Sequence, residues 1–137
     1  MSMDPNGEKS MANRAVDWFA QAEHDLRLAA IARDAGSHEW ACFAAQQAAE
    51  KAVKGLHLHQ GQEAWGHVVA RLMTELPQQP PTDLVERGRV LDNFYVSSRY
   101  PNGHPEGSPF DHYGPLQSGE ALKHAGEIIA FVRAEMA

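Results

Sequence analysis

The chain has 137 residues, of which 43% are hydrophobic, so its length suits one domain with a single buried core. Its formal net charge of -6 at pH 7 excludes a strongly basic protein that attracts nucleic acid by bulk charge. One cysteine excludes an internal disulfide, and no apolar run approaches the roughly 18 residues of a membrane span. We therefore expect a soluble, cytoplasmic protein.

The first predicted elements are a leader and a helix. Residues 1–12 are polar and are predicted to be a disordered leader, which leaves residues 13–137 as one helical domain. Apolar residues then recur at steps of three and four. This pattern predicts a first helix that is capped by Asn13 and ends near Gly36.

An alanine-rich helix is predicted next, from about Ser37 to Gln60. Small side chains on one narrow face let neighbouring helices approach closely, so we expect this helix to be central. Cys42 lies among the alanines and is expected to be a buried, inert thiol. The alanines that form this face are Ala41, Ala44, Ala45, Ala48, Ala49 and Ala52.

Three further helices follow in the prediction. A short one begins after His67, which is expected to be a structural helix-start residue, and a run of prolines ends it. The next is capped by Thr82 and runs to Arg99, because Pro101 disfavours its continuation. The last is capped by Ser118. No stretch alternates at period two, so the fold class is all-α, an antiparallel up-and-down bundle of four to five helices.

The loop between the last two helices carries the candidate chemistry. Arg99 lies in a last helical turn, where a cation complements the helix dipole. His104 follows five positions later, in a loop with two prolines and two glycines. Spacing alone favours a simpler interpretation, in which the arginine bonds the last carbonyls of the helix and the histidine is exposed to solvent.

Four stretches, in this order, resemble the HEPN family (higher eukaryotes and prokaryotes nucleotide-binding domain) over roughly residues 13–136. They are residues 14–19, residues 41–55, Gly66 with His67, and Arg99-Tyr100-Pro101 with His104. The resemblance implies a HEPN-like bundle and a metal-independent endoribonuclease. HEPN ribonucleases use the matching arginine and histidine for catalysis. In their reaction the RNA 2′-hydroxyl attacks the adjacent phosphate, and the product carries a 2′,3′-cyclic phosphate.

By this resemblance Arg99 and His104 are the catalytic residues. His104 would move protons at neutral pH, and Arg99 would hold the phosphate as its charge rises. HEPN proteins are typically two-fold dimers that place both loops in one cleft, which would supply the second histidine that the reaction needs. We therefore expect a homodimer that acts on RNA.

Two positions depart from the toxin-type members of the family. A small polar residue usually follows the arginine there, and here that residue is Tyr100. A tyrosine to which partner nucleotidyltransferases attach AMP often stands two positions after the histidine, and here that position is Glu106. These departures leave a rival open, a non-catalytic nucleotide-binding and interaction module that partners a small nucleotidyltransferase.

Four further residues are predicted to bind phosphate or nucleotide. Tyr100 and Asn102 belong to the loop, whereas Lys51 and Lys54 lie three apart on the second helix. Solvated surface is the commoner role of such lysines.

No metal and no cofactor are predicted. His104, Asp111 and His112 could meet in the loop, but their spacing matches no established metal site. The chain has no zinc pattern, no phosphate-binding glycine loop and no serine-nucleophile motif.

Overall fold

The computed structural model describes the backbone of residues 11–137 and the side chains of residues 14–137. Within this range the chain is all-α and has no strand. Of the predicted leader, residues 1–10 lie outside the described range, and residues 11 and 12 belong to the first helix. The elements are α1 (Met11–Asp34), α2 (His38–His59), α3 (Val69–Thr74), α4 (Thr82–Asp92), α5 (Phe94–Ser97), the 3-10 turn η1 (Pro101–Gly103), α6 (Pro109–His112) and α7 (Pro115–Met136).

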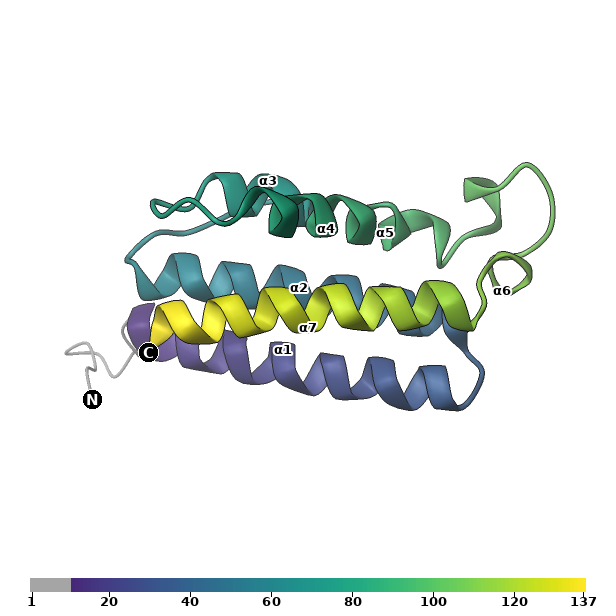
Figure 1. Cartoon of the computed structure of the whole chain (residues 1–137), viewed down its shortest axis with the longest axis horizontal. Helices are drawn as coiled ribbons and strands as arrows, with labels where there is room; N and C mark the ends of the chain where they lie inside the picture. Colours follow the sequence, from purple (N-terminus) through teal and green to yellow (C-terminus); the bar gives the residue numbers. More distant parts are fainter. Residues whose placement is uncertain (1–10) are drawn as a thin grey trace, which may run out of the picture.

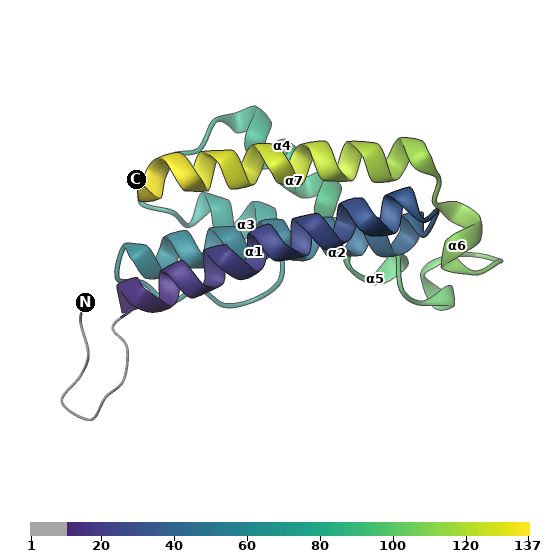
Figure 2. The same ribbon diagram turned by 90° about the horizontal axis from the view of Figure 1, so that it is seen from below.

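The long helices alternate in direction along the chain. α1, α2, the α4 and α5 pair, and α7 form an antiparallel bundle, and the predicted up-and-down arrangement is therefore confirmed (Figure 1). Seen from below, α1 runs beside α2 (Figure 2). The segment with η1 and α6 lies at one end of the bundle, away from the C-terminus (Figure 1). No described helix is long and apolar enough to cross a bilayer.

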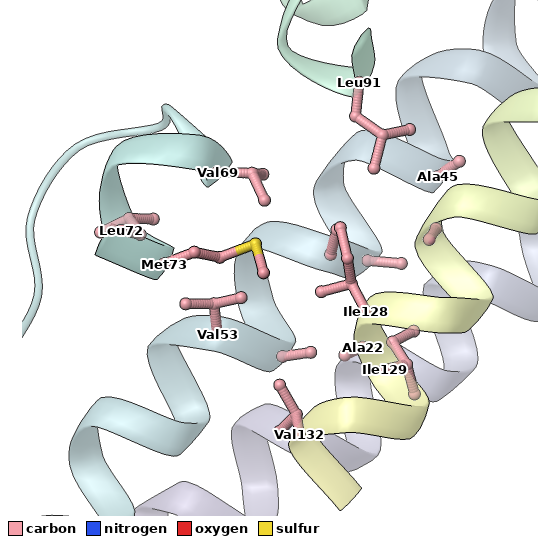
Figure 3. Packing of buried hydrophobic residues seen from close by; sticks show 14 of the residues in the cluster. Ala22, Ala45, Val53, Val69, Leu72, Met73, Leu91, Ile128, Ile129 and Val132 are labelled. Atoms are coloured by element: carbon pink, nitrogen blue, oxygen red, sulfur yellow. The ribbon is translucent and has the colours of Figure 1, made fainter. Parts of the chain in front are cut away.

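α2 is the central helix, as predicted, since it packs against every other α-helix of the described chain. All six alanines of its narrow face are buried. Gly55 continues this face, and a Cβ added there would lie 3.2 Å from the carbonyl oxygen of Ala15 on α1. Larger side chains of α3, α4 and α7 fill the space above the alanines (Figure 3), among them Val69, Leu72, Met73, Leu91, Ile128, Ile129 and Val132.

Cys42 lies within this packed core. Its side chain is fully buried, which confirms the predicted burial. Burial, together with the nearby Glu39 carboxylate, raises the pKa of the Cys42 thiol to about 12. Because the thiolate is the reactive form of cysteine, Cys42 is unreactive at neutral pH while the chain is folded.

Three helix starts differ from the prediction. α1 begins at Met11, two residues before Asn13, and α4 begins at Thr82 itself, so Thr82 is helical and not a cap. α7 begins at Pro115 because proline is pre-organised for a first helical position. Ser118 is therefore inside α7, where its buried hydroxyl lies 2.8 Å from Nδ1 of His38 on α2.

The predicted fourth helix is two helices, because the chain breaks at Asn93 between α4 and α5. Just before the break, the Asp92 carboxylate accepts hydrogen bonds from the backbone N–H groups of Val69 at 2.7 Å and Ala70 at 3.0 Å. The N-cap residue of α3 is Val68, which has no side-chain acceptor. Asp92 on α4 therefore caps α3 from a distance.

The close approach of α1 and α2 predicts that Gly55→Val destabilises the fold. The branched side chain meets the backbone of α1, and overpacking of this kind costs about 1–3 kcal/mol. Urea denaturation measures the change. Gly126→Val on α7 is the matched control, because no described group beyond the backbone of its own helix and its chain neighbours lies within 4 Å of a Cβ added at Gly126. Equal losses in the two variants would contradict the prediction.

The remote cap predicts that Asp92→Ala lowers the free energy of unfolding by about 1–2 kcal/mol, because two N–H groups at the start of α3 lose their acceptor. Thermal and urea denaturation measure this loss. Asp34→Ala is the control, since that side chain is 71% exposed and, among the described residues, pairs with Arg33 alone; it is expected to change stability by less than about 0.5 kcal/mol.

Candidate functional site

Arg99 lies just after α5, and its guanidinium packs among three aromatic rings. Nε and Nη2 donate hydrogen bonds to the Tyr95 carbonyl oxygen at 2.8 and 2.6 Å, because the last carbonyls of a helix have no partner inside it. The guanidinium carbon lies 4.2 Å from the centre of the Phe43 ring, 4.7 Å from Tyr95 and 5.1 Å from Tyr100. Nη1 has no hydrogen-bond partner in the described chain, so one edge of the guanidinium is free for a ligand.

The chain turns back towards α5 directly after Arg99. Tyr100 is extended, as the residue before a proline prefers, and Pro101–Gly103 form the single turn η1. Gly103 comes so close to α5 that an added Cβ would lie 3.0 Å from Cα of Ser97. This close approach places His104 beside the end of α5.

His104 is anchored to the same helix end as Arg99. Its Nε2 lies 2.6 Å from the Ser97 carbonyl oxygen, and because a carbonyl only accepts, Nε2 carries the proton. In the neutral ring the free lone pair is then on Nδ1. Carbonyl oxygens two residues apart, those of Tyr95 and Ser97, therefore hold the arginine and the histidine. Arg99 does bond one of the last carbonyls of the helix, that of Tyr95, whereas His104 is partly buried and anchored, and not simply exposed.

A second histidine, His112, stacks on His104. The ring centres are 4.1 Å apart and the ring planes differ by 1°. Nε2 of His112 lies 2.7 Å from the Glu106 carbonyl oxygen, so it too donates from Nε2. The ring lone pairs lie in parallel planes and do not converge on one ion. Nowhere in residues 11–137 do three or more His, Cys, Asp or Glu side chains form a possible metal site.

The sequence allowed His104 and His112 to meet in the loop, but it did not predict that their rings stack, because the signal for that contact is weak. α6 positions His112, and α6 begins with a capping box in which the Ser108 N–H donates to the Asp111 carboxylate at 3.0 Å. That Ser-x-x-Asp pattern, followed by Pro109, was the available sequence sign of a helical turn. It does not indicate which ring His112 meets.

The predicted phosphate-binding residues fall into two places. Tyr100 is 51% exposed and lies over Arg99, and Asn102 is exposed in η1, so both belong to the loop. Lys51 and Lys54 pair instead with Asp25 and Glu50.

Neither lysine contacts the loop arginine in the described chain. By the helical rise, Lys51 is about 12 Å and Lys54 about 16 Å along α2 from Phe43, which contacts Arg99. The described chain therefore does not bring the two lysines to Arg99.

Known proteins are similar to this chain along nearly its whole length. The HEPN domain profile matches residues 15–135. A search of curated proteins found no match.

Solved structures agree with the profile match. TT1696 from Thermus thermophilus is 51% identical with a TM-score of 0.88, and the alignment covers 90% of this chain and 98% of that one. ST0689, an archaeal HEPN homologue, is 40% identical with a TM-score of 0.79, covering 90% and 98%. The HEPN domain protein TM0613 from Thermotoga maritima is 32% identical with a TM-score of 0.71, covering 86% and 95%.

The close approach of the loop to α5 predicts that Gly103→Val releases His104. The side chain collides with the backbone at Ser97, so the Nε2–H of His104 loses its carbonyl acceptor and exchanges faster with water. Imidazole ¹H–¹⁵N NMR follows this proton. Asn102→Val, one position earlier in the same turn and exposed, is expected to leave it unchanged; an unaltered His104 signal in Gly103→Val would show the geometry to be wrong.

Proposed function

The chain belongs to the HEPN domain family, and on that premise we propose that it is a metal-independent endoribonuclease with Arg99 and His104 as its catalytic residues. One observation carries the proposal. At one end of the bundle, carbonyl oxygens of α5 hold the Arg99 guanidinium and the His104 imidazole. Within the described residues, Nη1 of Arg99 and Nδ1 of His104 have no hydrogen-bond partner. Two functional groups that are fixed before a substrate arrives lose little entropy when they bind it.

Each group has a task in cleavage by the RNA 2′-hydroxyl. The 2′-oxygen forms a bond to phosphorus and loses its proton. The bond between phosphorus and the 5′-oxygen breaks, and the 5′-oxygen receives a proton. The Nη1 edge of Arg99 stabilises the charge that grows on the phosphoryl oxygens. Nδ1 of His104 exchanges a proton with one of the two reacting oxygens.

A two-fold dimer is part of the proposal. It brings two arginines to one cleft, which offsets the net charge of -6 on each chain. Apolar side chains exposed near the loop are the proposed contact between copies. They are Val96, Tyr100, Phe110 and Leu116, between 50% and 80% exposed.

A second candidate function is a nucleotide-binding module that does not cleave RNA and that partners a small nucleotidyltransferase. The observation in its favour is that Arg99 already donates two hydrogen bonds to Tyr95 and is covered on one side by Tyr100. A nucleotide phosphate could still bind the free edge. In this case a nucleotide raises the melting temperature of the wild-type protein, and Arg99→Ala removes that shift.

The ribonuclease proposal predicts cleavage of single-stranded RNA in EDTA, with a 2′,3′-cyclic phosphate on the product. Arg99→Ala and His104→Ala are each expected to lower the rate at least about 100-fold. Gel analysis of end-labelled RNA measures the rate, and the solution mass measures dimerisation.

The control is Arg89→Ala on α4, whose side chain is 60% exposed and pairs with Glu86; it is expected to cleave like wild type. A wild-type protein that cleaves RNA no faster than the two loop variants would refute the proposed ribonuclease activity. A solution mass of one chain would refute the dimer.

A further inference from the structure

We propose that His67 receives the ribose 2′-hydroxyl of the RNA: it binds this group and takes its proton when the 2′-oxygen attacks phosphorus. The inference rests on the proposed function and names the base that the reaction needs besides His104. The 2′ O–H proton moves to Nε2 of His67 as the new O–P bond forms. The bond from phosphorus to the 5′-oxygen breaks, and protonated His104 gives its Nδ1 proton to that oxygen. The general base, His67, and the general acid, His104, then belong to one chain. The second copy of the dimer contributes further positive charge.

Glu50 fixes the tautomer of His67. Both carboxylate oxygens of Glu50 lie 3.2 Å from Nδ1 of His67, and a carboxylate only accepts, so Nδ1 carries the proton. The Gln46 side chain donates to the His67 carbonyl oxygen at 2.8 Å and holds the backbone. Nε2 has no hydrogen-bond partner among the described residues. His67 thus offers a free lone pair from a ring whose orientation is fixed.

The burial of Glu50 distinguishes this arrangement from a simple helix start. The Glu50 side chain is 5% exposed, whereas that of His67 is 57% exposed. A buried carboxylate is costly unless it is paired, and Lys54 at 3.1 Å and Gln47 at 3.3 Å provide partners. Such a carboxylate orients an imidazole base and stabilises the imidazolium that forms when the ring takes a proton.

Tyr95 connects His67 to the loop. The His67 and Tyr95 rings stack with centres 5.0 Å apart and planes 15° apart, and the Arg99 guanidinium carbon lies 4.7 Å from the same Tyr95 ring. The imidazole and the guanidinium therefore lie within about 10 Å of each other, since both distances end at one ring centre. One nucleotide can contact both.

A pocket of about 570 Å³ lies between His67 and the loop. Asn93, Tyr95, Ser97 and Gly103 are among its lining residues, together with His67. This volume falls in the range of small-ligand sites. Ser97, whose carbonyl oxygen holds His104, and Gly103, which precedes it, also line the pocket, so it extends from His67 to the segment that anchors His104.

The free lone pair selects the chemical group. The oxygens of an RNA phosphodiester only accept hydrogen bonds and do not pair with a neutral Nε2, whereas a ribose 2′-hydroxyl donates. The 2′-hydroxyl is also the group by which a protein distinguishes RNA from DNA. His67 therefore selects ribonucleotides as well as serving as the base.

Nucleotide binding tests this selection without any cleavage. Uridine 3′-monophosphate and 2′-deoxyuridine 3′-monophosphate are titrated into the full chain, and the ¹⁵N signal of His67 Nε2 is followed by NMR. We expect the ribonucleotide to bind at least threefold more tightly and to move that signal, and the deoxynucleotide to leave the signal in place. His67→Ala removes the preference. His59→Ala, an exposed histidine on α2, keeps it.

Cleavage of single-stranded RNA tests the proton transfer. His67→Gln keeps an acceptor near the position of Nε2, so it is expected to retain the ribonucleotide preference and KM while kcat falls about 100-fold. A residue with only a structural role would not separate kcat from KM.

Equal binding of the two nucleotides, or a His67 signal that neither of them moves, overturns the proposal for His67 even if RNA is cleaved. A wild-type protein that cleaves no RNA refutes the proposed function, and the nucleotide preference then still decides whether His67 receives the 2′-hydroxyl. The two failures are therefore distinct.

Discussion

The small-residue face of α2 is the constraint on which the rest of the structure depends. The six alanines of this face carry only methyl groups, so α1, α3, α4 and α7 can all approach α2 closely. The larger residues of α2 then project at the edges of this face. There Phe43 meets Arg99 after α5, and Glu50 meets His67 in the linker before α3. The packing of the core therefore also decides where the two ends of the candidate site lie.

The C-terminal end of α5 also positions residues of the candidate site. A helix of four residues leaves its last carbonyl oxygens without internal partners, and Arg99 and His104 satisfy two of them. The contacts with the aromatic rings do not occupy the guanidinium completely. A phosphate binds through N–H groups at an edge of the guanidinium, and Nη1 has no hydrogen-bond partner among the described residues. The packing of Arg99 is thus compatible with phosphate binding at Nη1.

Much of the fold could be predicted from local patterns. The 3.6-residue period of apolar side chains indicated the long helices, and the alanines of α2 indicated the central one, because burial follows directly from small apolar residues on one face. Pro101 and the glycines after it indicated the turn that follows Arg99. The caps were less predictable. Thr82 is the first residue of α4 and not its cap. Ser118 lies inside α7, because the helix starts at Pro115 and the Ser118 hydroxyl meets His38 on α2.

By itself the sequence determined the long helices, their order, the central position of α2, and the presence of an arginine and a histidine around a tight turn. Only the tertiary structure decided which groups those two residues meet. The cap that Asp92 provides for α3, the stack of His112 on His104, and the contact of Glu50 with His67 all join residues that have no periodic relation in the chain. The physical reason is that helix periodicity reports which face of a helix is buried, whereas the neighbour of a polar side chain depends on how separate helices and loops pack together.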